Sequence, residues 1–296
     1  MSLIQSARRY SGRTAPHRDA LPPMLHLAAP EPDLDGVVEC GIVVRQSAAT
    51  STSRFPAMPR AMITLTPGDG ATAAAVHFHA VSTRPMAYAH GRPFEALGLV
   101  LPPATAARLM GPSTGALVDA TLPWAELAGV AEAARLGDEL HLAGGDSERL
   151  RTLQGSLRRV LARGPERVQH ARAAALHRLC LAVGRQGARA ASSLGVGERQ
   201  LERRCRAWLG LAPKQLQRLT RFHAVLASAM RHQRLPGAET ALAAGYYDQS
   251  HLAREALQLA GAPLRDLLSG AHEDGAWWPL ATQRLPSAGG ALRHHR

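Results

Sequence analysis

The feature that most constrains the fold of this chain is an internal repeat of about 50 residues in its last third. The sequence Gly-Leu-Ala-Pro at residues 210–213 returns as Gly-Ala-Pro at residues 261–263. Upstream of each ending, a short helical pattern runs into a glycine, Gly195 or Gly245, and a longer helical pattern follows. Glycine accepts a positive φ without steric cost, so each is a candidate tight turn between two helices. The repeat therefore predicts two helix-turn-helix units.

The longer helix of the first unit, predicted over residues 197–208, has two chemically different faces. Leu201, Cys205 and Trp208 are expected to point inward. The opposite face is charged at i, i+3, i+4 and i+7 spacing. Guanidinium groups there can bind phosphates or form two hydrogen bonds to guanine O6 and N7. We therefore predict a recognition helix for the major groove of DNA, with the reading residues Arg199, Glu202, Arg203 and Arg206.

A long helix, opened by Pro213 and running to about residue 232, is predicted to join the two units. In the second unit, Asp248 is expected to cap a helix that extends through residue 259. The residues expected to pack inward on this helix are Leu252, Ala256 and Leu259. The outward residues, which we predict to contact DNA, are Gln249, Ser250, Ala253 and Arg254.

The distribution of charge supports a polyanionic partner for this part of the chain. The formal net charge is +12, and only one of the 35 basic residues, Lys214, is a lysine. A coding bias toward arginine would also produce this total, so the position of the charge is more informative. Residues 165–270 hold 16 Lys and Arg against seven Asp and Glu, an excess of nine positive charges. This concentration favours double-stranded DNA as the partner.

The composition argues against several other classes of protein. No apolar run reaches about 18 residues, so the sequence predicts no membrane-spanning helix. Cys40, Cys180 and Cys205 are an odd and scattered set, which indicates a reducing compartment rather than a disulfide framework or a zinc module. The sequence has no nucleophile elbow, phosphate loop or paired catalytic carboxylates. We expect a cytoplasmic protein without a cofactor and without enzymatic activity.

The pattern of the N-terminal half predicts short β-strands that are separated by glycine and proline residues. Strands are predicted at residues 41–46, 61–67, 75–83 and 97–101, with a turn at residues 68–70 and a helix at residues 103–110. Regular short strands with tight turns are typical of a small β-barrel or β-sandwich. Farther along, Ser147 is a candidate helix N-cap, and Gly184 and Gly187 are expected to close the next helix.

We therefore expect an α+β fold of two domains, a β-rich barrel followed by an all-α double helix-turn-helix domain. Trp277 and Trp278, near the C-terminus, are either a packing anchor or an exposed patch. The predicted division is a flexible leader at 1–35, a β-rich sensor or dimerisation domain at 36–130, a helical connector at 131–187, the DNA-binding domain at 188–270 and a flexible tail at 271–296.

Residues 188–268 resemble the DNA-binding domain of AraC/XylS-type transcriptional regulators, the arabinose-regulator family. The resemblance includes Arg-Gln-Leu-Glu-Arg-Arg at residues 199–204, Gly-Leu-Ala-Pro-Lys at 210–214 and Arg-Phe at 221–222. Its most specific part is Gly-Tyr-Tyr-Asp-Gln-Ser-His at residues 245–251, followed by Arg254. The resemblance implies two recognition helices held by a linker helix, so that both enter one face of the DNA. It assigns the two sets of outward residues given above to these two readers.

The chain departs from the family pattern at four positions. Gly197 stands where the family has Ser or a similar cap, and Cys205 and Ala256 stand where it has aromatic residues. Loss of two large core side chains is expected to loosen the recognition helices by about 2–4 kcal/mol each unless other groups, such as Trp208, fill the space. Ala253 lacks a polar contact, so the second reader is expected to depend more on phosphates.

Residues 61–129 resemble, more loosely, the small β-rich domain that precedes this module in some family members. Glu-Ala-Leu-Gly-Leu-Val-Leu-Pro-Pro-Ala at residues 95–104, Leu-Val-Asp at 117–119 and Trp-Ala-Glu-Leu at 124–127 support this likeness. The likeness implies a cupin-like sensor or dimerisation domain. A small-molecule effector, a second copy of the chain and RNA polymerase are therefore further candidate partners.

Two histidines keep an alternative open. His77 and His79 alternate on a predicted strand and share a face, with His90 a hairpin away, so a metal-dependent cupin-type enzyme is an alternative hypothesis. No carboxylate lies at a convincing position beside them, and we expect no metal. Tyr88, Arg84 and Arg92 are candidates to line a pocket for an anionic effector. A non-specific nucleic-acid binder that depends on charge alone is a third hypothesis.

The leading interpretation is a sequence-specific transcriptional regulator. Its two recognition helices are expected to enter successive major-groove segments about one helical turn (~34 Å) apart. Phosphate contacts would supply affinity for DNA. Sequence preference would come from base contacts of Arg203, Arg206, Gln249 and Arg254. An N-terminal domain would bias DNA binding through a ligand or through dimerisation.

Overall fold

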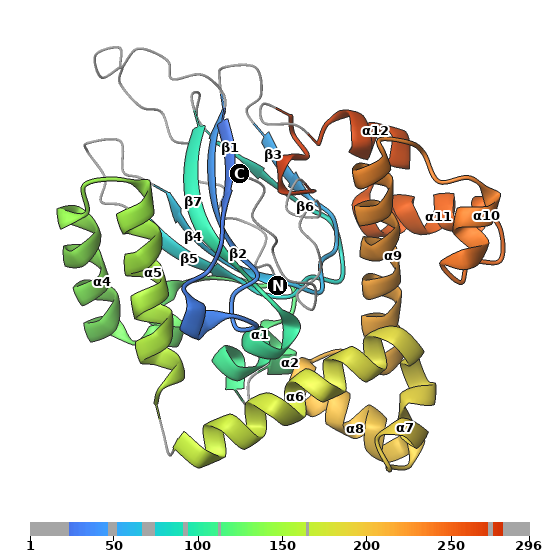
Figure 1. Cartoon of the computed structure of the whole chain (residues 1–296), viewed down its shortest axis with the longest axis horizontal. Helices are drawn as coiled ribbons and strands as arrows, with labels where there is room; N and C mark the ends of the chain where they lie inside the picture. Colours follow the sequence, from blue (N-terminus) through green and yellow to red (C-terminus); the bar gives the residue numbers. More distant parts are fainter. Residues whose placement is uncertain are drawn as a thin grey trace, which may run out of the picture.

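The fold is described by a computed structural model, which covers residues 24–46, 52–66, 75–90, 94–111, 114–163, 166–271 and 275–280. A β-rich unit occupies the N-terminal half, and helices make up the C-terminal half (Figure 1). This order confirms the predicted α+β architecture with two helix-turn-helix units. No helix in these ranges has the length and apolar character needed to cross a bilayer.

The β-rich unit contains a six-stranded antiparallel sheet and a separate two-stranded sheet. Among the described strands, β3 (Thr52–Phe55) and β6 (Met86–Ala89) pair only with each other and so form the smaller sheet. The larger sheet has the order β1 (Met24–Ala28), β2 (Cys40–Gln46), β7 (Phe94–Leu101), β4 (Ala61–Thr66), β5 (Ala75–His79) and β8 (Thr121–Pro123), and the smaller pairs β3 (Thr52–Phe55) with β6 (Met86–Ala89).

Both faces of the larger sheet are buried, which explains why its central strands are apolar at consecutive positions. On β7, Leu97, Leu99 and Leu101 belong to the main core, whereas Ala96 and Val100 join a second cluster on the other face. Between them, Gly98 allows β7 and β4 to approach closely. A Cβ at this position would lie 2.3 Å from the carbonyl oxygen of Ile63.

Helices cover one face of this sheet (Figure 1). The helix α5 (Asp146–Leu161) packs against β7, and Leu150 of α5 fills the space beside Gly41 of β2. Trp124 is buried beneath this layer and donates a hydrogen bond from Nε1 to Ser156 Oγ at 3.0 Å. The N-terminal helices are η1 (Pro32–Leu34), α1 (Pro103–Met110), α2 (Thr114–Leu117), α3 (Trp124–Ala128), α4 (Val130–Leu142) and α5 (Asp146–Leu161).

The C-terminal half is built around one long helix. Figure 1 shows α9 (Pro213–His232) running between two pairs of helices. At one end lie α7 (Ala190–Ser193) and α8 (Glu198–Leu209), and at the other end lie α10 (Ala238–Ala243) and α11 (Gln249–Ala260). This is the predicted linker between the two units. The helices are α6 (Glu166–Gln186), η3 (Gly187–Arg189), α7 (Ala190–Ser193), α8 (Glu198–Leu209), α9 (Pro213–His232), α10 (Ala238–Ala243), α11 (Gln249–Ala260) and α12 (Leu264–Ser269).

Several local predictions match the structure and others need correction. The helix at residues 103–110 is confirmed, and the strand predicted at 75–83 ends at His79. Ser147 lies inside the first turn of α5, because the N-cap is Gly145. Helix α6 ends before Gly187, which has a positive φ of 59° as expected for a closing glycine, but it continues through Gly184. Close packing against Thr220 of α9 explains the glycine at position 184. The predicted turn at residues 68–70 lies outside the described residues.

The predicted leader and tail are both too long. Met24–Ala28 forms strand β1, which pairs with β2 and is therefore part of the sheet. After the last helix, Trp277 and Trp278 are buried, and Trp278 joins the apolar cluster between the two sheets. The tryptophan pair is thus a packing anchor. Both segments, strand β1 and the one that holds the two tryptophans, are fixed in place by contacts with residues that are distant in the sequence.

Candidate nucleic-acid interface

The two helix-turn-helix units have the same turn geometry. Gly195 and Gly245 have positive φ angles of 64° and 81°, as predicted from glycine at these positions. In the first turn, Val196 N donates to Ala191 O at 3.0 Å. In the second, Tyr246 N donates to Ala241 O at 2.9 Å, which is the same bond 50 residues later. The internal repeat is therefore a repeat of backbone structure.

The first predicted recognition helix, α8, has the expected apolar and charged faces. Leu201 and Cys205 are buried, and Trp208 is half-buried against the same core. Helix α8 packs against α1 and α2 of the N-terminal half through this inner side. The structure exposes the four predicted reading residues, Arg199, Glu202, Arg203 and Arg206.

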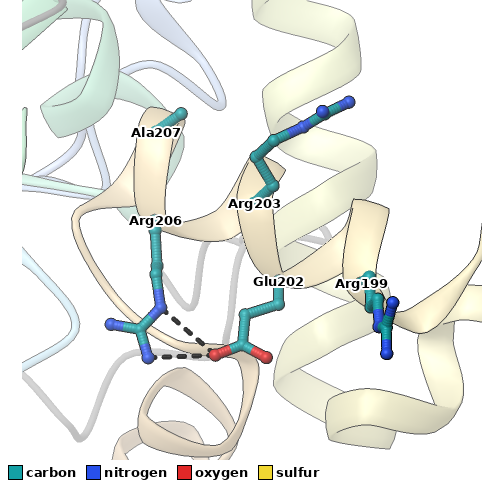
Figure 2. A pocket seen from close by; sticks show the side chains of 5 residues that line it. All are labelled: Arg199, Glu202, Arg203, Arg206 and Ala207. Carbon is teal, nitrogen blue, oxygen red and sulfur yellow. Dashed lines mark hydrogen bonds and ion pairs between the residues drawn. The ribbon is translucent and has the colours of Figure 1, made fainter.

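These four side chains and Ala207 line a shallow open hollow on the outer surface of α8 (Figure 2). Arg206 turns toward Glu202 and donates to its carboxylate from NH2 at 2.9 Å, whereas Arg203 points away from the pair (Figure 2). Both side chains of the pair are more than half exposed. An exposed ion pair of this kind contributes little to the stability of the fold. Arg206 can therefore leave Glu202 and bind a DNA phosphate with only a small loss of free energy.

The second predicted recognition helix, α11, begins at the predicted cap. Asp248 Oδ1 accepts a hydrogen bond from His251 N at 2.6 Å, which satisfies one of the free amides of the first turn. Leu252, Ala256 and Leu259 are buried, as predicted. The outward residues Gln249, Ser250, Ala253 and Arg254 are all exposed. The contact of both outer faces with DNA remains a prediction.

Two of the four positions that depart from the family pattern lie in the core. Cys205 and Ala256 are both completely buried. Burial raises the pKa of the Cys205 thiol to about 11, so it is a protonated apolar group under ordinary conditions. Cys40, Cys180 and Cys205 are all free thiols, and burial likewise raises the pKa of Cys40 and Cys180 to about 12.

A cluster around Glu255 was not predicted from the sequence. Glu255 lies on α11 and is buried, and it faces Arg218 and Arg221 of α9. Arg221 also lies over the ring of Tyr246, with its guanidinium carbon 4.2 Å from the ring centroid. The sequence offered one signal, Arg221 in the linker motif, but nothing in it connected that arginine to a carboxylate 34 residues later.

The N-terminal half makes direct hydrogen bonds to the linker and to the second unit. Ala57, in the segment after β3, is fully buried. Its N–H donates to Leu259 O of α11 at 2.6 Å, and its carbonyl lies 2.7 Å from His223 Nε2 of α9. After α12 the chain returns to the same region, where Trp278 Nε1 donates to Ser53 Oγ at 2.8 Å. These bonds join two regions that the sequence predicts as separate domains.

One histidine of the predicted pair, His79, is part of a hydrogen-bonded cluster between the two sheets. His79 Nε2 lies 2.8 Å from Thr64 Oγ1, and its Nδ1 lies 3.1 Å from Thr121 Oγ1 and 3.3 Å from Tyr88 OH. Burial, with a smaller contribution from His77, lowers the pKa of His79 to about 4. The neutral ring is therefore engaged with hydroxyl groups on both nitrogens.

The other candidates for a metal or effector site are dispersed. His90 contacts Ser53 at 3.1 Å and stacks on Phe94 rather than sharing the partners of His79. Arg84 is largely exposed beside Asp119, and Arg92 lies outside the described residues. In the part of the chain that the structure describes, no three His, Cys, Asp or Glu side chains are grouped as metal ligands would be.

Comparison with known proteins identifies the helical domain. Residues 190–269 match a family model described as a helix-turn-helix domain. No curated protein sequence matches the chain.

Solved structures of ToxT from Vibrio cholerae show a distant likeness. A 1.65 Å structure is 12% identical, covers 77% of this chain and 97% of its own, and has a TM-score of 0.41. A second is 10% identical, with coverages of 82% and 97% and a TM-score of 0.41. A structure of ToxT with a bound unsaturated fatty acid is 12% identical, with coverages of 77% and 94% and a TM-score of 0.40. TM-scores this low transfer neither a ligand nor a mechanism.

Proposed function

We propose that this chain, whose residues 190–269 form an AraC-type helix-turn-helix domain, is a sequence-specific DNA-binding transcriptional regulator. The observation that supports this most directly is the duplicated turn with an exposed polar face on the helix that follows each turn. A single such unit occurs in many contexts. Two units joined by one continuous helix can present two recognition surfaces to one DNA duplex.

In the proposed mechanism, α8 and α11 enter successive major-groove segments, about one helical turn (~34 Å) apart. Arginines of the domain bind phosphates and supply affinity that depends on salt. Arg203 and Arg206 of α8, together with Gln249 and Arg254 of α11, contact base edges and supply sequence preference. Glu202 accepts from a cytosine amino group once Arg206 moves to the DNA.

We further propose that the N-terminal domain biases DNA binding through a small ligand or through dimerisation. The hydrogen bonds of Ala57 to α9 and α11 support this, because a change in the position of that segment would act on the second unit directly. Such regulation requires that the ligand or partner copy bind one arrangement of the two parts more tightly. Contact with RNA polymerase, a cytoplasmic location and the absence of enzymatic activity complete the proposal.

The test begins with selection of binding sites for the full chain from random duplex DNA. Fluorescence anisotropy then compares the selected site with a scrambled duplex at two salt concentrations. A preference of ~10³ or more at physiological salt is expected for a regulator. Equal affinity for both duplexes, falling steeply with salt, would instead indicate a non-specific binder.

Substitutions then test the reading residues. Arg203→Ala and Arg254→Ala are each expected to lower discrimination between the two duplexes by about tenfold, because one base contact is lost in each half of the site. Arg135→Ala is the matched control, since Arg135 is an exposed arginine on α4 that pairs with Glu139. Undiminished discrimination in both variants would remove these two residues from the proposed reading set.

A further inference from the structure

Glu255 differs from its neighbours on the second recognition helix. Arg254 and Ala253 are exposed, whereas the side chain of Glu255 is only 5% exposed and points toward α9. A carboxylate withdrawn from water is unfavourable unless charged or hydrogen-bonding partners replace the water. The position of this side chain is therefore determined by its partners.

Three side chains supply those partners. Arg218 Nε donates to Glu255 Oε2 at 2.9 Å, and Arg221 NH2 lies 3.1 Å from each carboxylate oxygen. The Tyr246 hydroxyl donates to Oε1 at 2.6 Å. Burial and the nearby carboxylate raise the pKa of Tyr246, so its phenol remains a donor. Charge-assisted bonds of this kind are directional and depend strongly on geometry.

Arg221 extends the cluster to the turn itself. Its NH1 donates to Gly245 O at 3.1 Å, and its guanidinium lies over the Tyr246 ring. The same arginine therefore contacts the turn and the helix that follows the turn. Arg218 adds a hydrogen bond to Gln258, one turn farther along α11 than Glu255. The cluster holds both the direction in which α11 leaves the turn and its rotation about its own axis.

Among the residues that the structure describes, the first unit has no such cluster. When the two helices are aligned on the glycines that end them, Gly210 and Gly261, the position of Glu255 corresponds to Arg204. Arg204 is half-buried and lies near the Trp208 ring of its own helix. No ion pair joins α8 to α9 within the described ranges. Of the two units as described, the second is therefore the one with an ion-paired attachment to α9.

We infer that Glu255 is a positioning residue that fixes the orientation of α11 on the linker helix, and thereby the register of the second reader on DNA. This rests on the proposed function of α11 as a recognition helix. The angle between adjacent residues of a helix is fixed at about 100°, so the helix rotates as one body. A rotation that displaces Glu255 therefore displaces Ala253 and Arg254 by the same angle. Loss of the carboxylate is therefore expected to impair reading of the second half of the site alone.

The experiment uses Glu255→Gln in the full chain, which keeps the size of the side chain and removes its charge. Affinity is measured for three duplexes: the selected site, the same site with its first half scrambled, and the site with its second half scrambled. The ratio of affinities cancels any general change in phosphate binding. The expected result is an about tenfold fall in discrimination at the half read by α11, with discrimination at the other half unchanged.

Asp33→Asn is the matched control, because it also removes one ion-paired carboxylate but lies in the N-terminal half beside Arg158. If the Glu255→Gln variant does not fold, Arg218→Gln tests the same cluster, since Arg218 is partly exposed and Arg221 would still neutralise the carboxylate. Its expected effect is a smaller fall, again confined to one half of the site.

The outcomes separate this inference from the proposed function. A wild-type chain that selects no preferred sequence overturns the proposed function, and this inference with it. A wild type that discriminates, beside a Glu255→Gln variant that discriminates equally well at both halves, overturns only the positioning role. An equal loss at both halves also overturns it, because that pattern indicates general destabilisation rather than a displaced second reader.

Discussion

The two helix-turn-helix units share a backbone but are attached to the rest of the molecule in different ways. The first is held by apolar packing, since Leu201, Cys205 and Leu209 of α8 belong to a core continuous with the N-terminal half. The second unit contributes Ala256 and Leu259 to the same core and also has a small apolar cluster of its own, which includes Tyr246 and Leu252. It is attached in addition by the Glu255 cluster and by the hydrogen bond from Ala57.

The difference shows that one local structure can be positioned by two kinds of force. Apolar packing depends on volume and has little directionality, so the first unit should respond mainly to changes in the size of core side chains. Hydrogen bonds to a buried carboxylate are directional, so the second unit should respond mainly to loss of charge or of a donor. Three sets of substitutions examine this comparison.

The largest effect is expected from Trp278→Ala. Removal of this buried ring and of its bond to Ser53 should lower the free energy of unfolding by about 3–5 kcal/mol. Because the tail follows the second unit, hydrogen exchange of the Tyr246 amide should accelerate more than that of its counterpart, Val196. Urea unfolding and amide exchange measure the two effects. Equal acceleration of both amides would show that the tail does not distinguish the units.

The next effect compares counterpart leucines in the two recognition helices. Leu201→Ala and Leu252→Ala each remove a fully buried side chain, at a cost of about 2–5 kcal/mol. The larger loss is expected for Leu201, because it packs in the extended core shared with the N-terminal half. Urea titration followed by circular dichroism gives both values. Leu142→Ala on α4, where the side chain is 81% exposed, is the control. A larger cost for Leu252 would reverse the comparison.

The smallest expected effect is on the pH dependence of stability, and it concerns His79 of the N-terminal sheet rather than either helix-turn-helix unit. The pKa of His79 is lowered from 6.5 to about 4, so the unfolded chain takes up a proton first as the pH falls. The stabilising contribution of the neutral His79 ring is therefore fully present above about pH 6.5. It is lost toward pH 4, by about 1–2 kcal/mol for a ring that is partly accessible to solvent.

Denaturant titrations at pH 7 and pH 5 measure this loss. His79→Gln should abolish this part of the pH dependence, while His26→Gln, at an exposed position on β1, should leave it intact. An unchanged slope in the His79 variant would mean that another group is responsible for the acid sensitivity.

The local sequence pattern was sufficient to predict much of the secondary structure of the helix-turn-helix domain, because its helices are amphipathic and begin and end at characteristic residues. The turn glycines, the cap at Asp248 and the division of α8 into buried and exposed faces all followed from spacing. Strand β1 did not, because its five residues lie among prolines and lack a strong apolar alternation. Its partner β2 supplies the hydrogen bonds that make it a strand.

The sequence by itself determined the two repeated units, the linker between them and the polar outer faces, because periodicity and capping are properties of neighbouring residues. Only the tertiary structure decided what each unit is attached to. It placed Glu255 against two arginines that precede it by 37 and 34 residues, and Trp278 beside Ser53, which precedes it by 225. Such pairs leave no local pattern, since burial and charge pairing are decided only when distant segments meet.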